Sequence, residues 1–315
     1  MQTTVDQPGT TGGEKDRLTG TRAQSSAVPV GSSSAARRRR RLRPVLRQLL
    51  LLALVTPLAL LFLMPWAWML STAGKPTALI WKMPPVWIPP HYELQNFPEA
   101  WRMGEFGQNY LNTAFICLMG VVGVTLSSTL AAYAFARIRF PYRDALFVIV
   151  LSTMMLPAQV TLIPLYIIFS KLHWVNSFRP LVVPLFFGDA FSIFLLRQFL
   201  MTVPRELDDA ALIDGCSRFG VLFRILVPMI RPAVVVVAIF TFTWAWNDYM
   251  GPLIYLNSPH LFTITLGLTR FVGRTSMNIQ YLMAMTAVST LVPILVFFAT
   301  QRYFIQGIVI TGIKG

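Results

Sequence analysis

Charged residues are scarce in this chain. Asp, Glu, Lys and Arg make up 13% of its 315 residues, whereas 55% are apolar and the mean hydropathy is +0.58. Soluble domains carry about a quarter charged residues, so this composition excludes an ordinary water-soluble globular protein. Uncharged stretches are instead long enough to cross a hydrocarbon core, which takes about 20 helical residues.

Cysteine and histidine are also rare, with two and three residues. Cys117 lies in an apolar stretch and Cys216 in a charged one, so no disulfide framework is predicted. The histidines, His91, His173 and His260, have none of the short spacings that zinc sites use. No metal site is therefore predicted.

The chain lacks the phosphate-binding loop Gly-x-x-x-x-Gly-Lys-Ser/Thr that ATPases use. At the dipeptide Gly74-Lys75, Met69 stands where the first glycine belongs. We therefore expect the chain to bind no cofactor itself, and any ATP and Mg²⁺ to belong to a partner.

What the chain has in excess is positive charge near its start. The net charge is +14, and ten of the 27 Lys and Arg precede residue 48, including the run from Arg37 to Arg41. The polar composition of this region predicts a disordered basic tail over 1–44. A nucleic-acid-binding arm is the alternative, but the run lies next to apolar sequence, which favours a membrane-flanking role and no nucleic-acid partner.

Six apolar stretches predict an all-α membrane protein with six transmembrane helices. They cover 49–70 and about 109–135, 145–169, 180–200, 228–250 and 280–301. The first stretch exceeds the roughly 7–15 apolar residues of a signal peptide, so we interpret it as an anchor. With the N-terminus inside, 20 Lys and Arg lie on the inner side and seven on the outer side. The positive-inside rule therefore predicts that both termini are cytoplasmic.

A short amphipathic segment, 201–215, lies between the fourth and fifth stretches. Its first turn carries three acids, which the helix dipole favours there: Glu206, Asp208 and Asp209. Gly215 is a suitable helix stop. The i, i+3, i+4 spacing places three residues on one face, where small side chains allow close approach of another surface: Leu207, Ala210 and Ala211.

This segment resembles the EAA loop of ABC importer permeases, whose pattern is Glu-Ala-Ala, three residues, Gly, nine residues, Ile-x-Leu-Pro. The chain has Asp209-Ala210-Ala211, three residues, Gly215, nine residues, and Ile225-Leu226-Val227-Pro228. Asp209 replaces Glu and Val227 replaces Leu. The resemblance implies a coupling loop over about 201–228.

Further segments resemble the maltose-permease-like branch, carbohydrate uptake family 1. Phe187 to Phe191 with Phe194 to Phe199 resembles its fourth membrane segment, and Trp246 to Tyr249 with Pro252-Leu253 its fifth. The ending, Gln301 to Phe304, Gly307 and Gly312 to Gly315, resembles the tail of the second permease subunit. The resemblance covers about 45–315, which would form the six-helix transmembrane domain.

The resemblance implies a permease subunit of a binding-protein-dependent ABC importer for a sugar or sugar-like solute, and not an enzyme. It implies a bacterial or archaeal inner or plasma membrane, with lipid around the subunit. The implied partners are a second permease subunit, an ATPase dimer and an extracytoplasmic solute-binding protein. Which sugar is carried, and whether the permease pair is a homodimer or heterodimer, stays open.

The resemblance also assigns residues to two ATPase contacts. The coupling contact would use Glu206, Leu207, Asp209, Ala210, Ala211, Asp214, Gly215 and Pro228. The C-terminal contact would use Gln301, Arg302, Tyr303, Gly307 and Lys314.

Polar and aromatic residues in the fourth and fifth stretches are candidates for the solute path: Asp189, Trp244, Trp246, Asn247 and Asp248. A charge within a span is costly, so it usually has a functional or a paired role. Pairing of either acid with Arg197 or Arg179 is the structural alternative. For Trp246 the alternative is an interfacial anchor.

Two other functions fit the sequence less well. A membrane-embedded enzyme would need paired acids, or Ser with His, at facing depths, but only Asp189 and Asp248 lie within a span, and no histidine does. An ion-coupled secondary transporter would favour inverted repeats, and the sequence shows no internal repeat.

Overall fold

The computed structural model describes residues 34–273 and 277–311. Over these residues the chain is helical, apart from an isolated antiparallel bridge between Val272 and Met277. The chain divides into two compact units, Met1–Leu61 and Phe62–Gly315. The predicted all-α class is confirmed.

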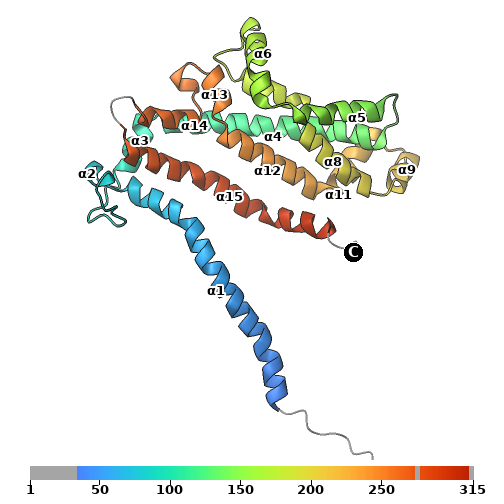
Figure 1. Ribbon diagram of the computed structural model, residues 1–315. Coiled ribbons are helices and arrows are strands. Elements are labelled where there is room, and N and C mark those ends of the chain that lie inside the picture. Colours follow the sequence, from blue (N-terminus) through green and yellow to red (C-terminus); the bar gives the residue numbers. More distant parts are fainter. Residues whose placement is uncertain (1–33, 274–276, 312–315) are drawn as a thin grey trace, which may run out of the picture. The chain divides into compact units, whose positions relative to one another are not determined.

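The longer helices in Figure 1 are α1 (Ser34–Ala73), α4 (Phe106–Arg137), α5 (Arg143–Ser152), α6 (Ala158–Lys171), α8 (Ala190–Thr202), α12 (Arg231–Asn247) and α15 (Ile279–Thr311). Shorter α-helices are α2 (Thr77–Ile80), α3 (Asn96–Met103), α7 (Arg179–Val182), α9 (Glu206–Ile213), α10 (Arg218–Gly220), α11 (Val227–Met229), α13 (Met250–Tyr255) and α14 (Ile264–Gly267). The 3-10 turns are η1 (Thr153–Met155), η2 (Val183–Phe187), η4 (Pro259–Leu261) and η5 (Leu268–Phe271), and η3 (Val221–Leu226) is a π-helix.

Four helical segments are long and apolar enough to cross a membrane: Gln48–Ala73, Phe106–Arg137, Arg179–Thr202 and Ile279–Arg302. The other two predicted spans are pairs of helices that meet at a sharp bend. Arg143–Met155 meets Ala158–Lys171 at 99°, and Arg218–Met229 meets Arg231–Asn247 at 83°. The six predicted stretches thus correspond to four spanning segments and two bent pairs, which make six spans if each pair counts as one.

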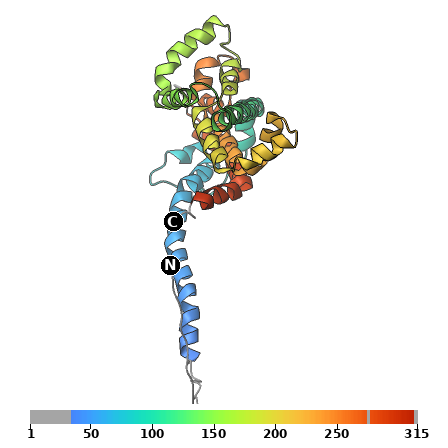
Figure 2. The same cartoon turned by 90° about the vertical axis from the view of Figure 1, so that its right-hand side faces the viewer.

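Proline explains where these two breaks fall. Pro157 has no N–H and its ring excludes a helical residue before it, so one helix ends ahead of Pro157 and α6 begins after it. Pro228 and Pro232 occupy the first turns of α11 and α12, where proline is tolerated. Figures 1 and 2 show α6 turned away from the other long helices of its unit.

Helix α4 is the centre of the bundle in the Phe62–Gly315 unit. It packs against α8 and α12, and α12 packs in turn against α15. Leu196, Leu200 and Leu222 are fully buried where α8 and η3 meet α4. Small residues allow close approach elsewhere along α4, since a Cβ on Gly123 would lie 2.9 Å from the ring of Phe186.

Lys75, which the predicted topology places on the outer side of the membrane, is buried. Lys75 is 1% exposed, and its Nζ lies 3.7 Å from the centroid of the Trp68 ring and 3.2 Å from Oγ1 of Thr72. Within the described residues no carboxylate pairs with it. Burial lowers the pKa of Lys75, and the cation–π contact partly replaces a counter-ion.

Helix α1 begins at Ser34, ahead of the anchor predicted from residue 49. Residues 34–44 are mostly Ala, Arg and Leu, which are strong helix formers and continue the anchor backwards. The tail predicted over 1–44 therefore overlaps the start of α1, and its boundary at 44 stays a prediction. The rest of the predicted tail, 1–33, lies outside the described residues.

We expect Gly267→Ala to destabilise the bundle near the start of α4. A Cβ on Gly267 would overlap Nδ2 of Asn109 and lie 3.1 Å from its Cγ. Asn109 is fully buried and donates to the carbonyl of Gly104 at 3.0 Å, so it has no room to move. Overpacking typically costs about 1–3 kcal/mol, so the melting temperature of the purified subunit should fall.

Gly107→Ala is the control, because the nearest atom to its added Cβ, Nε1 of Trp101, is 3.8 Å away. Equal melting temperatures for the two variants would contradict this prediction.

Candidate functional site

The predicted coupling segment forms α9, at the end of the bundle where α8 stops (Figure 1). Its first turn carries Glu206, Asp208 and Asp209, and no side chain caps its N-terminus among the residues described. The acids therefore provide the negative charge that the exposed N–H groups of the first turn favour. The helix lies where the sequence predicted it.

Gly215 ends α9 in a left-handed conformation, with φ of +82°. The N–H of Cys216 donates to the carbonyl of Ala211 at 2.9 Å, and the N–H of Gly215 donates to that of Leu212 at 3.1 Å. These two bonds form a Schellman motif, in which glycine is favoured because it has no Cβ. A Cβ at Gly215 would meet no atom of the described chain within 4 Å.

Helix α9 has one buried face and one exposed face, and they separate the two alanines. Ala211 is 7% exposed and belongs to the core that α9 shares with η3. Ala210 is exposed, as are Leu207 at 39% and Ile213 at 86%. The prediction that Leu207, Ala210 and Ala211 share one docking face is therefore wrong for Ala211.

Arg137, the last residue of α4, joins three elements. Its Nη2 donates to the carbonyl of Val203, just after α8, at 2.7 Å, and its Nε lies 3.1 Å from Oδ2 of Asp208 in α9. The side chains of Arg137 and Asp208 are 5% and 13% exposed. In the opposite direction, Nη2 of Arg205 donates to the carbonyl of Ala136 at 3.3 Å. Contacts made by Arg137 of α4 and by Arg205 at the start of α9 thus both attach α9 to α4.

Burial raises the pKa of Asp208, while the charge of Arg137 acts to lower it. Buried ion pairs add little net stability, so the contact of Arg137 with Asp208 mainly determines where α9 lies. The sequence showed Asp208 only as a first-turn acid and Arg137 only as an inner-side cation. Nothing in their spacing indicated that they meet.

The second half of the coupling loop contains the π-helix η3. Leu222 and Leu226 of η3 are fully buried in the core, whereas Pro228 is exposed in the first turn of α11. π-helical turns are rare and are found frequently at functional sites. The Ile-Leu-Val-Pro end of the loop therefore leads from a packed π turn into the bend before α12.

The helical segment that carries the predicted path residue Asp189 is interrupted at Gly188. This glycine has a φ of +90° and lies between η2 and α8. Asp189 caps α8, since its Oδ2 accepts hydrogen bonds from the N–H of Ser192 at 2.9 Å and from the Ser192 hydroxyl at 2.7 Å. Arg197 donates instead to the carbonyl of Phe135 at 3.3 Å. Asp189 is therefore a helix cap, a role that the sequence analysis did not consider.

A cavity of about 350 Å³ lies beside this break. Asp189, Phe191 and Ser192 line it from the start of α8, and Phe240 and Trp244 line it from α12. The Trp244 side chain is 58% exposed. Two of the five predicted path residues, Asp189 and Trp244, therefore meet at one cavity.

The other three path residues lie elsewhere. Trp246 is 5% exposed, and its Nε1 donates to the carbonyl of Ser289 at 3.2 Å, so its ring is a core contact between α12 and α15. Asn247 donates to a carbonyl of its own helix at 2.8 Å. Oδ1 of Asp248 accepts from the N–H of Gly251 at 3.1 Å, at the start of α13. Trp246, Asn247 and Asp248 do not line the cavity, and their assignment to the solute path stays a prediction.

The predicted C-terminal contact lies at the end of α15. Gln301 and Arg302 are exposed there. The side chains of Tyr303 and Gly307, and all of Lys314, lie outside the described residues. Contact of this segment with an ATPase stays a prediction.

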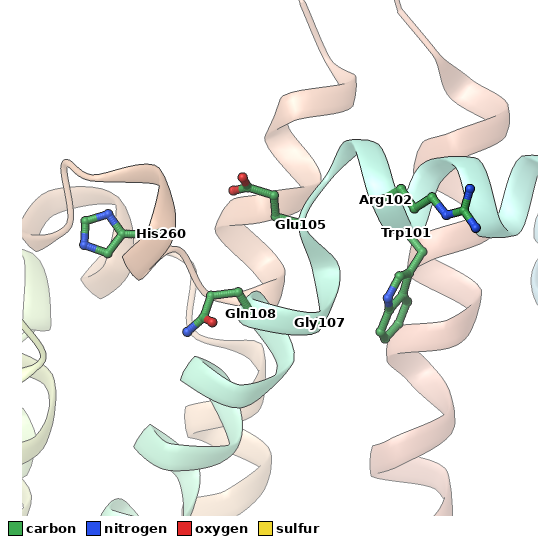
Figure 3. Close-up of a pocket in the computed structure, with 6 residues that line it drawn as sticks. All are labelled: Trp101, Arg102, Glu105, Gly107, Gln108 and His260. Atoms are coloured by element: carbon green, nitrogen blue, oxygen red, sulfur yellow. The ribbon is translucent and has the colours of Figure 1, made fainter.

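A cavity of about 600 Å³ lies at the corner between α3 and α4. Figure 3 shows that its side chains do not point toward a common centre: His260 comes from a separate segment, and Trp101 points away from Glu105. Glu105 pairs instead with Arg270 at 3.0 Å. No three metal-binding side chains gather in the described part of the chain. This corner therefore offers no catalytic constellation.

Residues 123–310 match the family described as "Binding-protein-dependent transport system inner membrane component". The chain belongs to this family. It is therefore a multi-pass membrane component of a transport system, and not an enzyme. The match begins within α4 and includes the Gly188 break, α9, η3 and most of α15.

Relatives support the same assignment. The Bacillus subtilis (strain 168) protein named "Probable ABC transporter permease protein YurM" is 32% identical over 256 residues, covering 80% of this chain and 83% of that protein. The "Arabinooligosaccharides transport system permease protein AraQ" of Halalkalibacterium halodurans is 35% identical over 205 residues, covering 65% and 73%. A chain of a solved bacterial ABC transporter "involved in the import of the acidic polysaccharide alginate" shares the fold, with a TM-score of 0.69 at 20% identity over 86% of this chain and 98% of that chain.

Removing one partner of the Arg137–Asp208 pair should destabilise the subunit more than removing both. Asp208→Asn leaves the Arg137 guanidinium buried without a counter-charge, which we expect to cost about 1–3 kcal/mol. Arg137→Met combined with Asp208→Leu removes both charges and should recover part of the loss. Unfolding of Arg137→Met, of Asp208→Leu and of their combination, measured in one detergent, gives the coupling energy. Asp209→Asn is the control, because Asp209 is exposed and forms no ion pair among the described residues. A coupling energy of zero would refute the proposed attachment of α9.

Proposed function

We propose that this chain is a permease subunit for a carbohydrate or sugar-like solute, and that α9 seats in a groove of a separate ATPase that holds ATP and Mg²⁺. The observation that carries this proposal is the construction of α9. It exposes Leu207, Ala210 and Ile213 to a partner, while Arg137 attaches its other face to α4. A coupling element must respond to two sites and move as a unit, and these contacts link α9 to the membrane bundle.

Carbohydrate is proposed on two grounds. The relative AraQ is named for arabinooligosaccharides. The cavity at the Gly188 break offers the aromatic rings of Phe191 and Trp244 beside the carboxylate of Asp189. Aromatic faces suit the apolar side of a sugar ring, and a charged acceptor forms strong hydrogen bonds with hydroxyls. Both cap bonds of Asp189 use Oδ2, which leaves Oδ1 for the solute.

The distribution of charge supports an orientation with both termini in the cytoplasm, since 20 Lys and Arg then lie inside and seven outside. In this orientation α9 faces an ATPase dimer, as does the end of α15 with Gln301 and Arg302. The segment 74–105 then faces the extracytoplasmic solute-binding protein. A second permease subunit, either a copy of this chain or a related one, completes the solute path in the inner membrane.

Bulk on the exposed face of α9 should uncouple transport without blocking insertion. In Ala210→Glu and Gly215→Asn we expect normal amounts of protein in the membrane, because Ala210 is exposed and Asn tolerates the left-handed backbone of Gly215. Uptake, and stimulation of the ATPase by the solute-loaded binding protein, should fall by about tenfold or more, which corresponds to about 1.4 kcal/mol of contact energy. Pro141→Glu is the control, since Pro141 is an exposed residue in the turn between α4 and α5, outside the spans. Normal uptake in both α9 variants at equal expression would rule out the docking face.

The solute cavity is tested separately from its structural role. Asn caps helices as well as Asp does, so Asp189→Asn should assemble and hydrolyse ATP normally while uptake falls or sugar preference changes. Trp244→Leu should act in the same way. Phe187→Leu is the control, since Phe187 is 82% exposed on the same segment and does not line the cavity. If uptake and preference are unchanged in both Asp189→Asn and Trp244→Leu, this cavity is not part of the path.

A further inference from the structure

A polar cavity of about 390 Å³ lies against the face of α9 that carries Asp208 and Leu212. The end of α4 forms one wall, with Tyr133 and Ile138, and Val221 of η3 lies on another. Asp208 faces the bundle, whereas Asp209 and Leu212 are exposed, so the cavity reaches from the buried face of α9 to its surface.

Basic residues dominate the lining. Four arginines contribute, from α4 and the turn after it, from the start of α9 and from α10: Arg137, Arg139, Arg205 and Arg218. The carboxylates of Asp208 and Asp209 also line the cavity, so positive charges exceed negative charges by two. Arg137 pairs with Asp208, and Arg205 donates to a carbonyl of α4. Within the described residues, Arg139 and Arg218 form no hydrogen bond or ion pair.

The cavity also contains polar atoms that are buried and unsatisfied. The Arg137 side chain is 5% exposed, and neither its Nε nor Oδ1 of Asp208 has a hydrogen-bond partner in the part of the chain that is described. Nε lies within ion-pair distance of Oδ2, but the N–H is not aligned with it. A buried donor without an acceptor is unfavourable. An acceptor oxygen of a ligand would satisfy Nε of Arg137, but not Oδ1 of Asp208, which is itself an acceptor.

We propose that this cavity binds a phosphate-type oxyanion, either free phosphate or the phosphate of an anionic lipid headgroup. The planar guanidinium presents paired N–H donors that match the oxygens of a phosphate. The nearby carboxylates do not prevent this, because Arg137 neutralises Asp208 and Asp209 is exposed to solvent. A bound anion would connect Arg139, after α4, with Arg218 in α10. It would therefore hold α9 against the bundle from its inner side.

The adjoining surface suits a lipid headgroup as the source. Arg139 also lines a neighbouring cavity of about 400 Å³, together with Tyr142 and Arg143. The Tyr142 side chain is 81% exposed. An exposed tyrosine beside arginines is typical of the membrane–water interface, where anionic headgroups are found. The oxyanion chemistry is the same for either source.

Two probes test the site in the full-length chain, purified with its partner subunits. Inorganic phosphate is titrated in neutral detergent against chloride at equal ionic strength, and the melting temperature is followed, because a ligand of the folded state raises it. Separately, the complex is placed in nanodiscs of phosphatidylcholine with phosphatidylglycerol, and retained phosphatidylglycerol is measured by native mass spectrometry. Each probe is applied to wild type, to Arg139→Gln/Arg218→Gln, and to the control Arg102→Gln/Arg179→Gln. The control pair is exposed, lies on other connections and removes the same charge.

We expect affinity for at least one probe to fall by about tenfold or more in Arg139→Gln/Arg218→Gln, as the loss of charge-assisted hydrogen bonds predicts, and to be unchanged in the control. Stabilisation by phosphate alone identifies a free anion, and selective retention of phosphatidylglycerol identifies a lipid. Should the double variant fail to assemble, Arg139→Gln alone provides the same comparison. Wild type that responds to neither probe, or a cavity variant that responds like the control, would overturn the proposal. Neither readout involves sugar uptake, so failure here is distinguishable from failure of the transport function.

Discussion

The guanidinium of Arg137 connects the membrane helices to α9. It occupies the last position of α4, donates to the carbonyl of Val203 after α8, and lies against Asp208 in α9. Because α4 also packs against α12, a displacement of α9 is resisted by most of the bundle. The side chain is 5% exposed, so water cannot easily replace its partners. Because buried ion pairs add little net stability, the main effect of Arg137 is to determine the position of α9.

The breaks in the membrane helices follow from a second constraint. In a bilayer each backbone polar group needs an internal partner, so a break persists only where other groups satisfy it. At Gly188 the partners are present: the N–H of Asp189 donates to the hydroxyl of Ser128 on α4 at 3.2 Å, and the Asp189 carboxylate accepts from the N–H of Ser192. The same carboxylate thus caps the N-terminus of α8 and is a polar group in the lining of the adjacent cavity. A break of this kind is a favourable place for a polar solute to contact the protein.

The two faces of α9 allow coupling and attachment to be altered independently. Leu207, Ala210 and Ile213 are directed away from this chain, whereas Ala211 and Asp208 are directed toward it. The basic cavity lies against Asp208 and extends to the exposed residues Asp209 and Leu212. An anion bound beside Asp208 would act on the position of α9 from the side that faces the bundle.

Much of this protein was predictable from the sequence alone. Composition and the length of the apolar stretches predicted an all-α membrane protein, and the acids and Gly215 predicted the position and the end of α9, because these signals are local in the chain. The sharp bends in the third and fifth spans could not be derived from the sequence, since it shows Pro157 and Pro232 but not the angle at which the flanking helices meet. The pairing of Arg137 with Asp208, the burial of Ala211 and Trp246, and the meeting of Asp189 with Trp244 were decided by tertiary structure. Each depends on which side of a helix faces a distant helix. The spacing of residues in the sequence does not determine how a helix is rotated about its axis relative to its neighbours.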